Sequence, residues 1–176
     1  DTTYAGGKEQ NKHRNKRNSK NIGGAGKQLV HTLVERGGRA RSNHIANVSG
    51  KTLRPVVMKQ VDRASTLMTD TAGGYMAMGK EFARHEMVDH GIGEYVRGDA
   101  HSNTVESYFA TFKRGIVGTY HSVSEAHLKR YLAEFDFRYN ERMALGIDDA
   151  ERTTRAIKGA EGKRITYRMP RETTHA

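Results

Sequence analysis

Three carboxylates in this sequence stand where they could act together on a metal-dependent reaction. Asp1 opens a predicted first strand, Asp70 closes the strand after the first predicted helix, and Glu106 lies one turn into a later helix. An acid at a strand end usually only solvates the exit or caps a turn, which is the plainer interpretation of each one alone. Carboxylates from neighbouring elements can instead converge on two divalent ions roughly 3.5–4 Å apart. Such hard oxygen ligands favour Mg²⁺ or Mn²⁺.

The predicted helix around Glu106 carries further polar groups on the same face. Lys113 follows Glu106 by seven residues, which is two helical turns, and Asn103 precedes it by almost one turn. This face could present an acid to a metal and an ammonium group to a phosphate. An ordinary amphipathic helix with a polar outer face explains the same pattern, and the spacing alone does not separate the two interpretations.

Histidines suggest a second kind of metal site. His85, His90 and His101 cluster in one poorly patterned stretch, so a mononuclear zinc site is conceivable. Their spacing matches none of the established metal-binding patterns, and we therefore interpret them as loop or surface residues.

The composition limits the class of protein. The 176 residues include 30 Lys+Arg against 20 Asp+Glu, a formal net charge of +10, and no Cys, which excludes disulfide scaffolds, thiolate nucleophiles and Cys-ligated metal centres. The apolar runs are too short to span a bilayer, and the first residues do not read as a secretory leader. Since the chain begins without Met, we expect a piece of a longer cytoplasmic protein that binds polyanions, with no membrane partner and no organic cofactor.

Half of the net charge lies in one short stretch, residues 8–20, which we call the basic segment. Six cationic residues face the single acid Glu9 there, which leaves a net charge of +5. The cationic residues are Lys8, Lys12, Arg14, Lys16, Arg17 and Lys20. Glycines flank the segment and nothing apolar interrupts it, so we predict a solvated loop. It is either a loop without a partner or a clamp on nucleic-acid phosphates, and its charge does not distinguish DNA from RNA.

Hydrophobic periodicity predicts an α/β domain. Alternation and a Gly-Gly turn predict strands at 1–5, 28–35 and 39–48, followed by a helix at 52–64 and a strand at 65–70. Residues 75–102 read as mixed loop with a short strand. Later helices are predicted at 103–114, 124–143 and 148–157, with a terminal strand at 163–168.

Three blocks of this sequence resemble a known family. They are DTTYAGGK at residues 1–8, LMTD at 67–70 and, above all, HSNTVESYFATFKRG at 101–115. These blocks are similar to the ISXO-like transposase domain, the DDE-type catalytic domain of a group of bacterial insertion-sequence transposases. The similarity continues through residues 123–125, 130–135 and 137–140 and so covers nearly the whole chain.

The resemblance implies a fold, an activity and partners. The fold would be an RNase H-like mixed sheet, with three antiparallel strands first and helices on both faces. It would form a catalytic domain at 1–168, with the loop 8–26 as an insertion and 169–176 as a tail. The activity would be two-metal cleavage of DNA at insertion-sequence ends and strand transfer into a target, by a protein that self-associates on DNA in the bacterial cytoplasm at the nucleoid.

The resemblance also assigns site residues. Asp1 and Asp70 become the first two ligands of two Mg²⁺ or Mn²⁺ ions, and Lys113 becomes the basic residue that follows the third catalytic position. We take Glu106 as the third ligand, because its seven-residue step to Lys113 is common among DDE enzymes, and Asn103 as the alternative. Lys113, Arg114 and the basic segment would hold the DNA backbone.

This sequence departs from the family pattern in two ways, and we therefore consider two alternative functions. Family members begin Asp-Glu-Thr-Tyr, whereas position 2 here is Thr, and their upstream zinc ribbon has no counterpart in this sequence. With Asp1 as its first residue, the first strand is expected to be half-built. One alternative is therefore a catalytically inactive, basic DNA-binding remnant of a transposase. Another is a repair or junction nuclease with the same fold.

Overall fold

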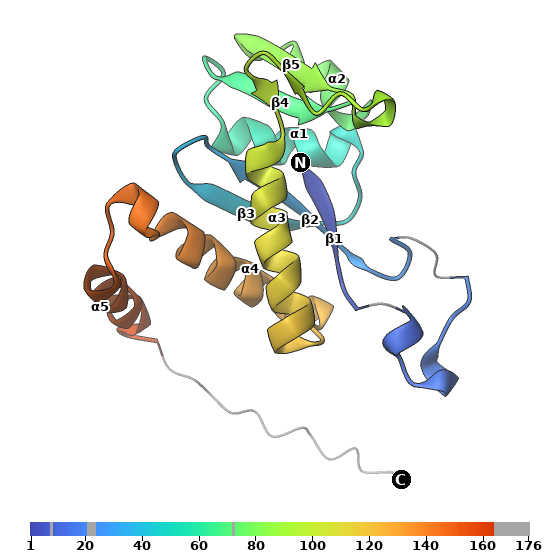
Figure 1. Cartoon of the computed structure of the whole chain (residues 1–176), viewed down its shortest axis with the longest axis vertical. Coiled ribbons are helices and arrows are strands. Elements are labelled where there is room, and N and C mark those ends of the chain that lie inside the picture. The colour runs from blue at the N-terminus through green and yellow to red at the C-terminus, as the bar shows by residue number, and fades with distance from the viewer. Residues whose placement is uncertain (8, 21–23, 72, 164–176) are drawn as a thin grey trace. The chain divides into compact units, whose positions relative to one another are not determined.

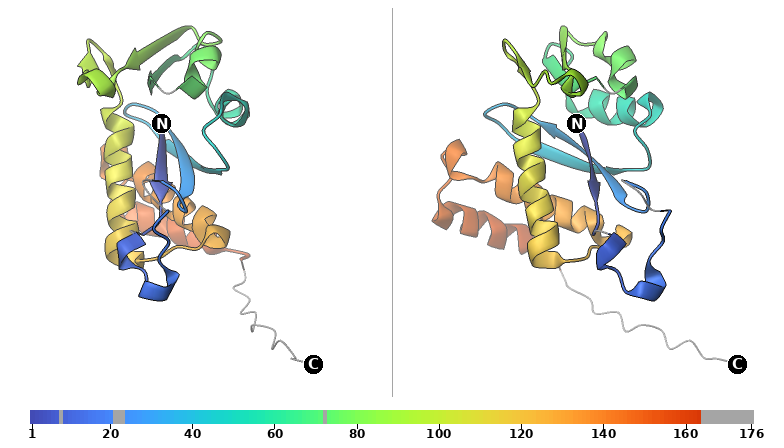
Figure 2. Two further views of the ribbon diagram at one scale, coloured as in Figure 1. Left: turned by 90° about the vertical axis from the view of Figure 1, so that its right-hand side faces the viewer. Right: turned by 45° about the vertical axis from the view of Figure 1, so that its right-hand side comes forward.

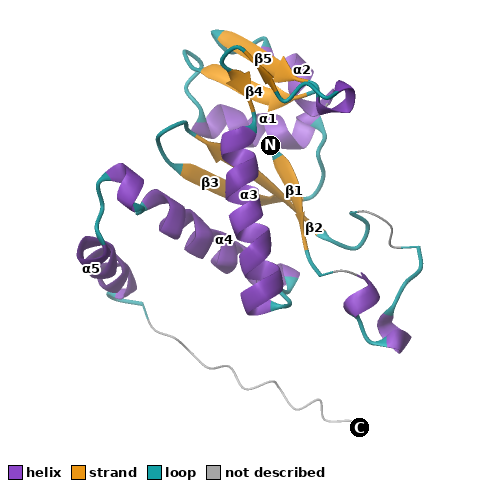
Figure 3. Ribbon diagram, viewed as in Figure 1, coloured by secondary structure: helices purple, strands orange, loops and turns teal. Residues whose placement is uncertain are grey.

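The computed structural model describes residues 1–7, 9–20, 24–71 and 73–163 (Figure 1). Its contacts divide the chain into two compact units, Asp1–Asn140 and Glu141–Ala176. The first unit contains strands and helices together, which confirms the predicted α/β class (Figure 3). The predicted domain boundary at residue 168 lies outside the described residues and stays a prediction.

Three antiparallel strands form the sheet at the centre of the first unit. They are β1 (Thr2–Ala5), β2 (Gln28–Val34) and β3 (Ala40–Ile45), paired in the order β1-β2-β3. The turn between β2 and β3 places Gly37 at φ 66°, a left-handed backbone conformation that favours glycine. The Gly-Gly signal for this hairpin is therefore confirmed.

Five α-helices lie in the part of the chain that the structure describes. They are α1 (Gly50–Gln60), α2 (Gly73–Gly79), α3 (Asn103–Gly115), α4 (Glu125–Asn140) and α5 (Asp149–Ala160). The predicted helices at 103–114, 124–143 and 148–157 correspond to α3, α4 and α5, although α4 ends three residues earlier than predicted. A π-helical turn, Ile116–Tyr120, follows α3 directly.

The two faces of the sheet pack against different helices, because neighbouring side chains of a strand point to opposite faces. On β2, Val30 lies in a hydrophobic cluster with residues of α3 and α4. Leu29 and Leu33 instead pack against a second cluster, with residues of α1 and α2. Figure 2 shows α3 running along one side of β1 and β2. We call these the α3 face and the α1 face of the sheet.

The cluster on the α3 face fixes α3 and α4 against the sheet. Phe112 is fully buried and its ring meets that of Phe135 edge-on, with centroids 5.2 Å apart. Leu128 and Leu132 of α4 are 1% and 2% exposed. The apolar face predicted for residues 103–114 is therefore confirmed, and its polar side remains available for the site.

The first helix differs from its prediction at both ends. It begins at Gly50 rather than 52, because the Asn47 side-chain oxygen accepts hydrogen bonds from the Ser49 amide at 3.1 Å and the Thr52 hydroxyl at 2.7 Å. It ends at Gln60, four residues before the predicted end. The turn that follows leads into the strand β4 (Thr66–Asp70).

The stretch 75–102, predicted as mixed loop with a short strand, is more regular than its sequence indicates. It contains the strand β5 (Arg84–Val88), the hairpin β6 (Val96–Arg97) and β7 (Ala100–His101), and most of α2. Helix α2 was not predicted, because three of its seven residues are glycine. Tyr75 and Met78 are each 2% exposed, so burial in the core outweighs the poor helix propensity.

The strands of the first unit form three hydrogen-bonded sets rather than one mixed sheet. The strand β4 (Thr66–Asp70) pairs with β5 in parallel, with Asp70 opposite Val88. Among the described residues, β4 has no strand partner on its other side, and β6 pairs only with β7. The described residues thus contain the predicted antiparallel strands and a parallel pair, but no ladder joins β1 to β4 as one mixed sheet would require.

The second unit contains α5 and the short helical turn Met143–Leu145. Asp148 caps α5 by accepting a hydrogen bond from the Glu151 amide at 2.7 Å. Nearly all of the predicted strand 163–168 lies outside the described residues. Nowhere in the described parts of the chain is a helix both long and apolar enough to span a membrane.

Candidate active site

The pairing of β1 with β2 determines where the Asp1 side chain points. The Asp1 carbonyl accepts a hydrogen bond from the Thr32 amide at 2.9 Å, and the Asp1 amino group donates to the Thr32 carbonyl at 3.1 Å. Asp1 therefore shares a face with Ala5, which lies in the cluster with α3 and α4. The first candidate carboxylate lies on the α3 face.

The alternation of side chains along β4 indicates to which side of this strand the Asp70 side chain points. Leu67 packs into the cluster on the α1 face, so Asp70, three residues on, points to the opposite side of its strand. The negative charge of Asp70 also acts on the Asp1 amino group, where it partly offsets the desolvation that lowers the amino pKa to about 5. The second candidate carboxylate therefore lies on the side of β4 away from the cluster on the α1 face.

Glu106 already has partners at the start of α3. The Ser102 hydroxyl donates a hydrogen bond to Glu106 Oε1 at 2.5 Å. His90 Nε2 lies 3.5 Å from the same oxygen and 3.2 Å from the Ser102 hydroxyl. Asn103, the alternative third ligand, is the first residue of α3 and is exposed. Both candidates thus lie in the first turn of α3.

The structure does not gather the three carboxylates into one coordination sphere. Among the described residues, which include all three, no group of three or more His, Asp or Glu side chains is close enough to hold a metal ion. Asp1 and Asp70 fit a hard divalent cation in their chemistry and in the side to which they point. For Glu106 to join them, its carboxylate must exchange the Ser102 and His90 contacts for the metal.

The zinc alternative finds no geometric support in the described parts of the chain. His85 Nε2 lies 2.9 Å from the Thr69 hydroxyl, and His90 contacts Ser102, so each ring has a separate partner. Burial lowers the pKa of His85 below its usual range. His85 and His90 thus each contact a neighbouring element, and with His101 they form no metal cluster in the described structure.

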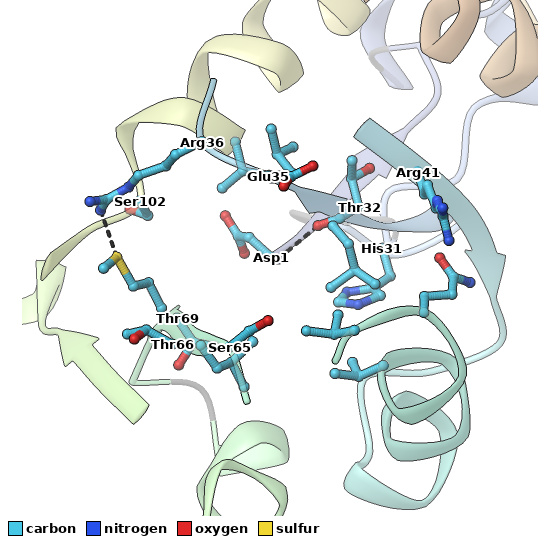
Figure 4. Close-up of a pocket in the computed structure, with 18 of the residues that line it drawn as sticks. Asp1, His31, Thr32, Glu35, Arg36, Arg41, Ser65, Thr66, Thr69 and Ser102 are labelled. Atoms are coloured by element: carbon cyan, nitrogen blue, oxygen red, sulfur yellow. Dashed lines mark hydrogen bonds between the residues drawn. The ribbon is translucent and has the colours of Figure 1, made fainter. Parts of the chain in front are cut away.

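A cavity of about 600 Å³ lies beside Asp1, between the ends of β2 and β4 (Figure 4). Its walls include the apolar residues Leu33, Val34, Leu67 and Met68. At its rim, the Arg36 guanidinium donates hydrogen bonds to Met68 Sδ at 2.6 Å and to the His101 carbonyl at 3.2 Å. Of the three candidate acids, Asp1 lines this cavity, whereas Asp70 and Glu106 do not.

Sequence reasoning missed a buried polar group under this site. His31 is fully buried, and its Nδ1 lies 3.2 Å from the Tyr75 hydroxyl and 3.4 Å from the Thr2 hydroxyl. Burial, assisted by the Asp1 amino group, lowers the His31 pKa to about 3. Burial likewise raises the Tyr75 pKa to about 12. The alternating strand pattern placed His31 and Thr2, but nothing in the sequence indicated that Tyr75 would reach them.

Thr2 lies on the opposite face of β1 from Asp1. This placement shows what the change from the Glu of the family pattern to Thr at position 2 means for the site. Thr2 is opposite His31 in the ladder, and its hydroxyl points to the α1 face, 3.3 Å from the Tyr75 hydroxyl. An acid at this position would share that face rather than the α3 face of Asp1. The replacement of Glu by Thr therefore removes no ligand from the side of Asp1.

Cationic residues predicted to bind DNA are exposed. Lys113 and Arg114 lie in the last turn of α3. The basic segment forms two short 3-10 turns, Glu9–Asn11 and Arg14–Lys16, with no buried residue. Its described cationic residues, all exposed, are Lys12, Arg14, Lys16, Arg17 and Lys20. Lys8 lies outside the described residues.

Comparison with known proteins identifies the family. Residues 1–140 match the ISXO2-like transposase domain, which is most of the chain. The chain belongs to the ISXO2-like transposase family. The family match ends at Asn140, where the first compact unit also ends, so this unit corresponds to the transposase domain.

One curated relative has an insertion-element origin. It is described as an uncharacterized protein in transposable element ISH50 of Halobacterium salinarum, and it is 34% identical over 113 residues. The match covers 62% of this chain and 37% of the relative, so the chain spans little more than a third of that protein's length. No solved structure matches the chain.

Proposed function

We propose that this transposase domain catalyses metal-dependent cleavage and strand transfer of DNA at insertion-sequence ends, on an RNase H-like fold. The observation that carries the proposal is the placement of Asp1 and Asp70. They come from strands of two different sheets: Asp1 lies on the α3 face, and Asp70 lies on the side of β4 opposite to Leu67, which packs in the cluster on the α1 face. Membership of the transposase family supports the same reaction class.

Asp1, Asp70 and Glu106 would hold two Mg²⁺ or Mn²⁺ ions, with Asn103 as the alternative to Glu106. When bound, such ions stabilise the charge on the attacking and leaving oxygens of a phosphoryl transfer. Glu106 lies in the first turn of α3, and Lys113 and Arg114 lie in its last turn. The helix would thus present a carboxylate to the metal ions at the reacting phosphate. Its cationic side chains would contact phosphates farther along the DNA.

The basic segment would hold the DNA backbone away from the reacting phosphate. Its residues 10–20 are exposed, and its charged side chains are of one sign apart from Glu9, which pairs with Lys12 at 2.7 Å. Contacts of this kind fix the register on DNA without reading its sequence. Since the reaction joins two DNA ends to a target, we expect the protein to self-associate on DNA. We expect this assembly in the cytoplasm, at the nucleoid.

A second candidate function is a DNA-binding remnant without catalysis. The observation that favours it is Glu106, whose carboxylate is held by Ser102 and His90 instead of joining Asp1 and Asp70. A domain that cannot release Glu106 from these contacts would bind DNA through its cations and leave the phosphate uncut.

The deciding experiment is strand transfer of a pre-cut, labelled DNA end of the insertion sequence in Mg²⁺ or Mn²⁺. Asp70→Ala should abolish product, by at least about 10³-fold, and leave DNA binding unchanged in a filter-binding assay. Asp99→Ala, an exposed acid in the β6–β7 hairpin, is the matched control and should stay active. Full activity of Asp70→Ala would disprove the catalytic assignment. An unmutated protein that binds DNA tightly but makes no product would favour the remnant.

The third ligand is decided by two further variants in the same assay. If Glu106 binds metal, Glu106→Gln loses activity and Asn103→Ala keeps it, because an amide is a neutral and weaker ligand for a hard cation. The reverse result assigns Asn103, and Glu106 then only stabilises the start of α3.

A further inference from the structure

The Tyr75 hydroxyl lies at the junction of three elements of the first unit. It comes from α2 and lies 3.3 Å from the Thr2 hydroxyl of β1 and 3.2 Å from His31 Nδ1 of β2. Thr2 and His31 are direct partners in the ladder, and their polar atoms are 3.4 Å apart. Tyr75 is 2% exposed and its ring centroid lies 6.0 Å from that of His31. One phenol oxygen therefore closes a triangle of buried hydrogen bonds.

Two residues of this triangle are close in the chain to the two candidate metal ligands. Thr2 directly follows Asp1, and Tyr75 lies five residues after Asp70, in the helix that β4 leads into. The negative charge of Asp70 acts to raise the pKa of both the Asp1 amino group and the Tyr75 phenol. No ladder joins β1 to β4 in the described residues, so the phenol supplies a hydrogen-bonded link between β1, which follows Asp1, and α2, the helix that follows β4.

The triangle is neutral at physiological pH. Burial raises the pKa of Tyr75 to about 12 and lowers that of His31 to about 3, so the phenol keeps its proton and the imidazole is uncharged. Either the Tyr75 hydroxyl or His31 Nδ1 can be the donor in the bond between them, depending on the His31 tautomer, and the buried His31 Nε2 has no hydrogen-bond partner among the described residues. A neutral link adds no charge to compete with a carboxylate for a cation.

We propose that Tyr75 is a positioning residue for the metal site, whose hydroxyl fixes the separation of Asp1 and Asp70. This inference rests on the proposed function, because it assumes that these two carboxylates share bound ions. Metal ligands must be held to within about 0.5 Å of their working geometry, and groups that orient ligands matter for that reason. Loss of such an orienting group typically weakens metal binding by about 10–100-fold.

The test measures metal binding without any reaction. Mn²⁺ is titrated into the protein in the absence of DNA, and free Mn²⁺ is followed by electron paramagnetic resonance. Tyr75→Phe removes one oxygen and keeps the packed ring, and it should weaken Mn²⁺ binding by about 10-fold or more. DNA affinity in EDTA should not change, and strand transfer should recover at raised Mn²⁺ concentration. Tyr4→Phe is the matched control, since Tyr4 is an exposed tyrosine on β1, and it should bind Mn²⁺ as the unmutated protein does.

A second variant tests the other end of the link. Thr2→Val keeps the shape of the side chain and removes its hydroxyl, so it should weaken Mn²⁺ binding in the same direction. The double variant should bind no worse than Tyr75→Phe, because both changes break one link. If the two reductions in Mn²⁺ affinity multiply in the double variant, the proposal is overturned. If Tyr75→Phe fails to fold, the Mn²⁺ affinity of Thr2→Val alone decides whether the hydrogen-bonded link positions the metal ligands.

The outcomes separate this inference from the proposed function. If the unmutated protein binds Mn²⁺, Asp70→Ala does not and Tyr75→Phe binds normally, the positioning role is wrong and the metal site stands. If the unmutated protein binds no Mn²⁺ at all, both the metal site and the positioning role are overturned.

Discussion

His31 is a fully buried histidine whose protonation should make the fold sensitive to acid. Burial lowers its pKa in the folded protein to about 3, against about 6.5 in the unfolded chain. Between these values only the unfolded chain binds the proton, so the free energy of unfolding falls as the pH drops below 6.5. From pH 7.5 to pH 5.0 we expect this one residue to cost about 2 kcal/mol, measured by urea unfolding at both pH values.

The variant His31→Gln should lose that part of the pH dependence, whatever its stability at pH 7.5. His127→Gln is the control, because His127 is exposed on α4, and it should keep the full dependence. The buried amino group of Asp1 titrates in the same range and contributes equally to all three proteins. An unchanged pH dependence in His31→Gln would contradict this account.

At the scale of the residue, the sequence indicated the candidate ligands but not their surroundings. Alternation along a strand follows from sequence, and it correctly placed Asp1 at the start of the first strand and Asp70 at the end of β4. The contact of Glu106 with Ser102 has the i,i+4 spacing of a helix, but its contact with His90 joins residues whose order along the chain does not reveal their separation. Tyr75 escaped notice for the same reason, since its helix was not predicted.

At the scale of the element, hydrophobic periodicity was sufficient to predict the helices in which the pattern repeats over several turns. Helices α3 and α4 have apolar residues every three or four positions, and the hairpin of β2 and β3 has a glycine turn, so both were predicted. Helix α2 and the two-residue strands β6 and β7 are too short for a period to repeat. Their structure depends on packing partners far away in the sequence, which a local pattern does not contain.

One carboxylate should hold three of these elements together. Asp136 of α4 accepts hydrogen bonds from the Tyr108 hydroxyl at 2.6 Å, the Ser42 hydroxyl at 2.7 Å and the Ser42 amide at 2.8 Å. Tyr108 lies on α3 and Ser42 on β3, and burial, with the Asp136 bond, raises the Tyr108 pKa above its usual range. Asp136→Ala leaves these buried donors without their acceptor, so we expect a loss of about 2–4 kcal/mol in urea unfolding.

Asp99→Ala is the control for this change, because it removes a carboxylate from an exposed hairpin position. It should alter the free energy of unfolding by no more than about 0.5 kcal/mol. If Asp136→Ala were equally mild, the packing of Phe112, Leu128 and Leu132 alone would hold α3 and α4 to the sheet.

At the scale of the whole molecule, the net charge of +10 should appear in DNA binding as salt dependence. Each phosphate neutralised on duplex DNA contributes about 0.9 to the slope of log K against log salt. Within the basic segment, Lys12 pairs with Glu9 and supports Arg17 through its carbonyl, so these two residues also shape the loop. The triple variant Arg14→Gln, Lys16→Gln and Lys20→Gln should reduce the slope by up to about 2.7.

A matched triple variant distinguishes a clamp from the effect of total charge. Lys51, Lys129 and Arg130 are exposed cations of α1 and α4, and their change to Gln lowers the net charge by the same three units. If the basic segment touches phosphates, the slope falls in the first variant and stays near its original value in the second, measured by filter binding between 50 and 200 mM salt, about the range over which such contacts respond. Equal falls in both would mean that the charge acts through the field of the whole molecule and that the segment is a solvated loop.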